Sequence, residues 1–173
     1  RERLVLLVEG SDLSSVLDLA KVTASDTIQR NSNLFRTSVR GGDDRPWAQH
    51  LIHRASDGTP VRSKSELKIM DDCLAAGLRP RYEQRLESAS GDGSFKLPDF
   101  TFVTDAGDAV IWEHLGMLDL TVYANDWERK RQWYAANSFT EGQTLFTTSE
   151  VGGLQSSAVS ATIEKVRRAI EEN

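Results

Sequence analysis

The sequence predicts an α/β domain in which a mixed central sheet is flanked by helices, in the order α-β-β-β-α-β followed by a last helix. Three observations predict it: short apolar runs typical of strands, segments with helical period, and tight turns between the first strands. These turns make the first three strands an antiparallel meander, whereas the helix before the fourth strand allows a parallel pairing. The predicted helices span 63–76, 125–137 and 157–171, and the predicted strands span 81–87, 96–103, 109–115 and 143–147.

The first helix is predicted to begin at Ser63, because apolar residues then recur at helical spacing, and to end before Gly77, a residue suited to the position after a helix. The strand at 81–87 (RYEQRLE) is separated from the next by residues 90–93 (SGDG), a strong turn signal. The strands at 96–103 (KLPDFTFV) and 109–115 (AVIWEHL) complete the meander.

The second half of the domain continues with a helix predicted from Asn125, a fourth strand at 143–147 (QTLFT) and a final amphipathic helix. Before the domain, residues 3–8 predict a buried strand that Gly10 ends, and a short helix is predicted from Ser11 or Asp12 to about Lys21. Residues 22–60 are mixed and polar, with a turn-rich stretch at 41–46, and are interpreted as a connector. The predicted division is therefore an appendage at 1–60 and a domain at 61–173.

The amino-acid composition limits the classes of protein to which the chain can belong. The 173 residues are 39% hydrophobic and 27% charged, which is typical of a globular domain. No apolar run approaches the ~20 residues that span a bilayer, and a lone cysteine, Cys73, excludes a disulfide framework. A reducing, cytoplasmic setting is expected. Because the chain begins with Arg1 rather than methionine, we expect it to be a piece of a longer protein.

Two carboxylates are predicted to face each other on adjacent strands. The turn between the second and third strands centres near Ala106 and Gly107, so Asp99 and Glu113 fall opposite or diagonal to each other, ~5–8 Å apart. Carboxylates that close repel unless a positive charge lies between them, and a hard divalent cation such as Mg²⁺ suits oxygen ligands. The alternative is that both are solvated on an open sheet face, but their apolar neighbours favour strands covered on both faces.

Glu66 is a third candidate with two interpretations. The spacing Ser63-x-x-Glu66 is that of a capping box, in which Glu66 binds the Ser63 amide. The helical period also places Glu66 on one stripe with Met70 and Cys73, which points it toward the sheet that carries the two other acids. For Glu66 taken alone, the capping role is the stronger interpretation. Its place on the stripe that faces the sheet favours a role in the site.

Lys130 is the fourth candidate. On the helix at 125–137 it falls near Trp127, Trp133 and Tyr134 by helical spacing, whereas Arg131 is less well placed. A lysine among aromatic residues is equally consistent with a cation–π or snorkelling role. The pair His50-x-x-His53 has the spacing of two zinc ligands, but it is interpreted as a surface feature, since no further ligand lies near it in the sequence.

These residues together resemble the PD-(D/E)XK nuclease superfamily, and the element order resembles its restriction-endonuclease-like core. The resemblance covers about residues 61–170, and more narrowly it is to the nuclease domain fused behind bacterial superfamily 1 DNA helicases. It is carried by 63–67 (SKSEL), Tyr82-Glu83, 98–100 (PDF) and 112–116 (WEHLG). Residues 1–7 (RERLVLL), 25–27 (SDT) and 30–35 (RNSNLF) resemble the end of such a helicase core and its connector.

The resemblance implies roles for the candidate residues. Asp99 and Glu113 would ligate Mg²⁺ or Mn²⁺ together with the backbone carbonyl of His114, and Glu66 would hold a metal-bound water or a second ion. The family's usual lysine, two positions after the acid, is replaced here by Leu115. Some members supply that lysine from the following helix, and Lys130 is the natural substitute.

The function expected from the resemblance is metal-dependent hydrolysis of DNA, single-stranded or duplex, in DNA repair or bacterial defence. Phosphate contacts are predicted from Arg62, Lys64 and Arg81. The net charge of −5 is unlike the basic footprint of a free-standing nucleic-acid binder, so another component is expected to deliver the substrate. The resemblance implies that this component is a helicase core in the same polypeptide. The alternative is a catalytically inactive DNA-binding or protein-docking domain of the same fold, which the change at Leu115 would suit.

Overall fold

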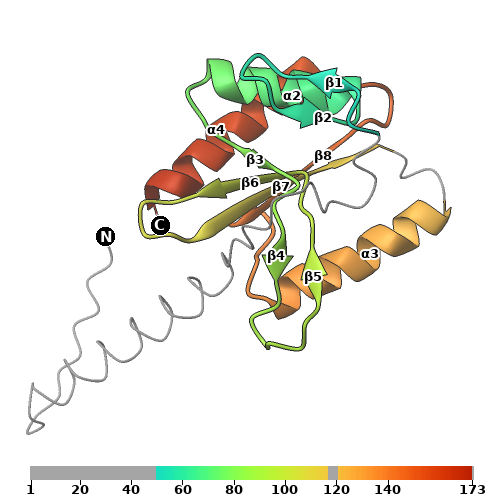
Figure 1. The fold of residues 1–173 in the computed structure, drawn as a ribbon, viewed down its shortest axis with the longest axis vertical. Helices are drawn as coiled ribbons and strands as arrows, with labels where there is room; N and C mark the ends of the chain where they lie inside the picture. Colours follow the sequence, from blue (N-terminus) through green and yellow to red (C-terminus); the bar gives the residue numbers. More distant parts are fainter. Residues whose placement is uncertain (1–49, 117–120, 173) are drawn as a thin grey trace, which may run out of the picture.

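A computed structural model describes residues 50–116 and 121–172 as a mixed α/β fold (Figure 1). The central sheet has the order β3-β6-β7-β8. Helices α2 (Lys64–Ala75) and α4 (Ser156–Glu172) lie on one face, and α3 (Thr121–Ala136) lies on the other. The predicted α/β class with helices on both faces of a mixed sheet is confirmed. The strand predicted at 3–8 and the helix predicted after Ser11 lie outside the described residues.

The register of the sheet follows the predicted turns. Strand β6 (Phe100–Val103) pairs antiparallel with β7 (Ala109–Leu115), with Phe100 opposite Trp112. Strand β3 (Arg81–Tyr82) joins the other side of β6 antiparallel, and β8 (Leu145–Ser149) pairs parallel with β7. The predictions of an antiparallel meander and a parallel fourth strand are confirmed.

Two predicted strands are wrong in extent, because each is divided in the structure. The segment 81–87 forms β3 and then β4 (Leu86–Glu87), and 96–103 forms the end of β5 (Phe95–Lys96) and then β6. Glu83, at φ 46°, turns the chain out of the sheet, and Pro98 has no amide to donate to a neighbouring strand. Strands β4 and β5 pair with each other as a separate hairpin beside α3 (Figure 1). Asp99 therefore lies immediately before β6 rather than in the middle of a strand.

Helix α2 begins and ends as the sequence predicts. The Ser63 side chain accepts a hydrogen bond from the Glu66 amide, and the Glu66 side chain accepts one from the Ser63 amide, which completes the capping box. At the other end Gly77 adopts φ +83°, with its amide bound to the Leu74 carbonyl and the Leu78 amide bound to the Cys73 carbonyl. This is the Schellman arrangement, in which glycine supplies the left-handed residue.

Two boundaries in the second half differ from the prediction. Helix α3 begins at Thr121 rather than Asn125. Its first turn was not predicted, because Thr, Val and Tyr favour strands by propensity. Strand β8 spans Leu145–Ser149 rather than 143–147, because residues 143–145 donate their amides to the Thr140 carbonyl in a turn. Helix α4 matches its predicted bounds to within one residue at each end.

A hairpin that the sequence analysis did not predict precedes α2. Strands β1 (His53–Arg54) and β2 (Pro60–Val61) pair antiparallel within and next to the stretch interpreted as a connector. Val61 is fully buried, and Ala55 in the intervening turn is also part of the core. The hairpin is joined to α2 by the Ser56 amide, which donates to Asp71 Oδ1 at 2.7 Å.

The side chains of the sheet alternate between two apolar clusters, one on each face of the sheet. Val110 and Trp112 of β7 pack with α2 and α4, as does Phe102 of β6, whereas Ala109 and Ile111 pack toward α3. Every residue of β7 is buried, so this strand lies at the centre of the domain. None of the described helices is long and apolar enough to cross a membrane.

Candidate active site

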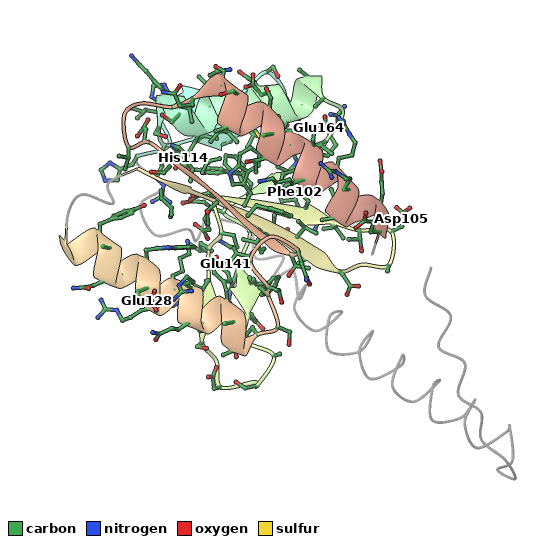
Figure 2. All side chains as sticks on the ribbon, turned by 180° about the vertical axis from the view of Figure 1, so that it is seen from behind. Phe102, Asp105, His114, Glu128, Glu141 and Glu164 are labelled. Carbon is green, nitrogen blue, oxygen red and sulfur yellow. The ribbon has the colours of Figure 1, made fainter. Side chains whose placement is uncertain are left out.

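The candidate site is a pocket of about 540 Å³ at the end of the sheet where β7 ends and β6 begins. Figure 2 shows this end by His114, with Asp105 in the β6–β7 turn at the far end. The pocket contains the predicted acids together with the predicted lysine. Its charged lining residues are the carboxylates of Glu66, Asp99, Glu113, Asp126 and Glu150, and the cations of Arg62 and Lys130. With five carboxylates against two cations, the pocket has an excess of negative charge.

Asp99 lies beside Glu113 because the register of β6 and β7, continued by one residue beyond Phe100 and Trp112, places the two acids opposite each other. Its Oδ2 atom accepts a hydrogen bond of 2.7 Å from the His114 amide. Burial, and next the repulsion of the Glu113 carboxylate, raise the pKa of Asp99 from 3.8 to about 7, against the smaller opposing effects of Lys130 and the His114 amide. The local field therefore disfavours the ionised form of Asp99 when no further cation is present.

Glu113 is buried and has two partners on α3. Lys130 Nζ lies 2.7 Å from Oε1 and 2.8 Å from Oε2 of Glu113, and it also donates to the Leu97 carbonyl at 3.2 Å. The Tyr134 hydroxyl, on a fully buried ring, donates to Glu113 Oε1. Burial acts to lower the pKa of Lys130, but Glu113 and Asp99 outweigh it and raise the pKa above its ordinary value. The lysine is therefore charged and directed at the acid pair.

Glu66 satisfies both interpretations made from the sequence. Its Oε2 atom accepts hydrogen bonds from the amides of Arg62 (3.1 Å) and Ser63 (2.8 Å) and from the Tyr82 hydroxyl (3.0 Å). The same carboxylate lines the pocket, and its charge contributes to the raised pKa of Asp99. The cap fixes the orientation in which Glu66 reaches the pocket.

The three basic residues predicted to contact phosphates are placed differently. Arg62 lines the pocket. Lys64 is exposed in the first turn of α2, and Arg81 is exposed on β3 with its guanidinium bound to Gln84; neither belongs to the pocket lining. Leu115, two positions after Glu113 on the same strand, also lines the pocket.

Several polar residues of the site were not predicted to belong to it. Tyr82 and Tyr134 each donate to a site carboxylate, and Tyr123 and Glu150 line the pocket. Tyr134 carried a signal, because it lies one helical turn from Lys130. Glu150 follows the observed end of β8 at Ser149, two residues beyond the predicted end of that strand. Glu150 also accepts a hydrogen bond from the Ser65 hydroxyl.

Glu83 is a second buried acid close to the pocket. It adopts φ 46°, a conformation that costs a residue with a side chain roughly 1–3 kcal/mol, and its amide donates to the Asp99 carbonyl at 3.3 Å. The Glu83 side chain is only 1% exposed and forms an ion pair with the Arg62 guanidinium. A buried carboxylate requires such a partner, because an unpaired buried charge is strongly destabilising.

The oxygen atoms of the pocket could hold a hard divalent cation with only a few ligands from the protein. Across residues 50–116 and 121–172, no three side chains of His, Cys, Asp or Glu converge as metal ligands. Mg²⁺ usually keeps several waters and takes one or two carboxylates, so Asp99 and Glu113 with a backbone carbonyl are an adequate set. The excess of carboxylates and the raised pKa of Asp99 both indicate a deficit of positive charge that such an ion would relieve.

Comparisons of the chain with protein-family models, with curated proteins and with solved structures found no match.

Proposed function

We propose that this chain is a metal-dependent deoxyribonuclease of the PD-(D/E)XK type, which hydrolyses phosphodiester bonds of DNA. The observation that carries the proposal is the convergence of Asp99, Glu113 and Lys130 in one pocket, with Lys130 Nζ within 2.8 Å of Glu113. Two adjacent carboxylates with a lysine are the residue types that the family motif requires. The order of helices and strands and the mixed sheet also support a restriction-endonuclease-like core.

Asp99, Glu113 and the backbone carbonyl of His114 would hold Mg²⁺ or Mn²⁺, with Glu66 at the side of the same pocket. A bound divalent cation supplies Lewis acidity toward a phosphoryl oxygen and lowers the pKa of a water molecule. In the protein, the hydrogen bond from the His114 amide orients Asp99, and the Tyr134 hydroxyl orients Glu113. Both acids are thus held in place before the substrate arrives.

Lys130 is proposed to take the role of the lysine that Leu115 replaces. Its ammonium group is held at the pocket by Glu113 and the Leu97 carbonyl. Negative charge develops on the oxygens of the phosphoryl group during hydrolysis, and a positive charge already in place stabilises it without reorganisation. The same ammonium also pairs with the Glu113 carboxylate and so offsets part of the negative charge of the pocket.

The source of the substrate is the second part of the proposal. The net charge of −5 and the acidic pocket provide little general attraction for DNA. We propose that a superfamily 1 helicase core delivers the DNA, because residues 1–7, 25–27 and 30–35 resemble the end of such a core and its connector. These residues lie outside the described part of the chain.

The test is to incubate the protein with labelled single-stranded and duplex DNA in the presence of Mg²⁺, Mn²⁺ or EDTA, beside Asp99→Ala. We expect cutting that requires a metal and is lost in Asp99→Ala. Absence of cutting while DNA is still bound would instead favour an inactive DNA-binding domain, and absence of both would favour a protein-docking domain.

Glu66→Gln separates the capping role from the role in the pocket. Glutamine also completes a capping box, so we expect the free energy of unfolding to change by less than about 0.5 kcal/mol. The charge at the pocket is lost, so we expect the rate of DNA cutting to fall. Chemical denaturation measures the free energy of unfolding, and a cleavage time course measures the rate of DNA cutting.

Ser63→Ala is the matched control for Glu66→Gln. It removes the cap but keeps the carboxylate, and should lower stability by about 1 kcal/mol. If Glu66→Gln lost as much stability as Ser63→Ala and cut DNA at the normal rate, Glu66 would be a cap only.

A further inference from the structure

We infer that Glu83 is a positioning residue, whose buried carboxylate holds the Arg62 guanidinium at the pocket as a contact for a DNA phosphate. This inference deepens the proposed function and depends on it for the identity of the ligand. It starts from the position of Glu83, which ends β3 in a left-handed conformation and turns its side chain into the protein. The Glu83 side chain is 1% exposed, and its carboxylate forms an ion pair with Arg62.

Arg62 is the one of the two partners that can meet a ligand. Its side chain is 34% exposed and lines the pocket that contains Asp99 and Glu113. A guanidinium has five N–H donors in a planar fork, so binding a carboxylate at one nitrogen leaves others for a phosphate. The backbone of Arg62 is fixed as well, since its amide donates to Glu66 Oε2 and to the Tyr82 hydroxyl.

The ion pair connects the phosphate contact to the acid pair. Glu83 donates its amide to the Asp99 carbonyl, so Arg62, Glu83 and Asp99 form a continuous series of contacts. A free arginine would lose side-chain freedom on binding DNA, and Glu83 removes that loss by ordering Arg62 in advance. The arrangement thus places a phosphate contact at a defined distance from the acids.

The sign of the effect of Glu83→Gln distinguishes positioning from simple electrostatics. Removing a negative charge near a DNA-binding pocket should tighten binding if only net charge matters. If Glu83 positions Arg62, the same change should weaken binding, with Kd rising about two- to tenfold, the factor that corresponds to ordering one side chain.

The experiment measures the Kd of a short labelled single-stranded and duplex oligonucleotide in EDTA, over a series of salt concentrations. The variants are Glu83→Gln, Arg62→Ala and the double variant. We expect Arg62→Ala to reduce the slope of log K against log salt by about 0.7–0.9, the value for one lost phosphate contact. We expect Glu83→Gln to have no further effect when Arg62 is already absent.

Glu164→Gln is the matched control, because it removes the same charge from an exposed ion pair with Arg167 on α4 (Figure 2). It should leave Kd unchanged. Unchanged or tighter binding by Glu83→Gln, or an equal loss with and without Arg62, would overturn the inference. Because these measurements contain no metal and no cutting, weakened binding without nuclease activity would overturn only the proposed function.

Discussion

Lys130→Met is expected to reduce metal-dependent DNA cutting about a hundred- to thousandfold, the usual effect of removing one preplaced charge that stabilises a transition state. Methionine keeps the length and apolar character of the side chain, but it cannot pair with Glu113. The quantity to measure is the single-turnover rate in Mg²⁺ and in Mn²⁺, with a thermal melt to show that the variant is folded.

Arg131→Ala is the matched control for Lys130→Met, because Arg131 is the next residue of α3 but is exposed and pairs with Glu128 and Glu141. It should cut at the normal rate. Equal rates for Lys130→Met and the unchanged protein would contradict the proposed role of Lys130.

Leu115→Lys in the Lys130→Met protein is a more demanding test of the proposal that Lys130 takes the role of a lysine at position 115. Leu115 lines the pocket on the same strand as Glu113 and two residues beyond it, so both side chains leave the same face of the sheet. We expect a lysine at this position to restore part of the lost rate. A folded double variant with no recovery would show that the position of Lys130 cannot be exchanged with that of Leu115.

Asp99→Asn is expected to stabilise the metal-free protein at neutral pH while it abolishes cutting. The pKa of Asp99 is raised from 3.8 to about 7 on folding, so between these values the folded state retains a proton that the unfolded state releases. Stability from this group is therefore present below about pH 4 and is lost as pH rises to about 7. Since Asp99 is half-buried, we expect Asp99→Asn to raise the free energy of unfolding at pH 8 by about 1–2 kcal/mol, which is less than the full pKa shift would give.

The measurement is thermal and denaturant unfolding between pH 4 and pH 8 in EDTA, where Asp99→Asn should melt roughly 2–8 °C higher than the unchanged protein at pH 8. Added Mg²⁺ or Mn²⁺ should stabilise the unchanged protein and not the variant, because an ion that binds only the folded state shifts the equilibrium toward it. Asp105→Asn, the same change in the exposed β6–β7 turn, is the control and should do neither. A less stable Asp99→Asn protein at pH 8 would contradict the prediction.

Local features of the chain were enough to predict much of the fold. Helix α2 carries its own cap at Ser63 and its own terminator at Gly77, and both act as predicted. The turn before β7 fixes the register with β6, and that register alone brings Asp99 and Glu113 together. These features depend on neighbours in the sequence or on one tight turn, so the pattern of residues suffices to predict them.

The interruption of the strand at Glu83 was not visible in the sequence. Glutamate has no intrinsic preference for a left-handed conformation. Glu83 adopts one at a position where its carboxylate pairs with Arg62, which lies between β2 and α2. Pro98 carries a local signal for the second interruption, because proline has no amide to donate to a neighbouring strand. The segment around Glu83 has the composition of a continuous strand, and its division appears only in the structure.

The contacts that complete the site were decided by tertiary structure. Helical period places Lys130 and Tyr134 on one face of α3, but it does not say which strand that face covers. The structure packs α3 against the face of β7 that carries Glu113, and so both residues reach the same carboxylate. Glu150 likewise enters the pocket because β8 lies parallel to β7, and both strands therefore end at the same edge of the sheet.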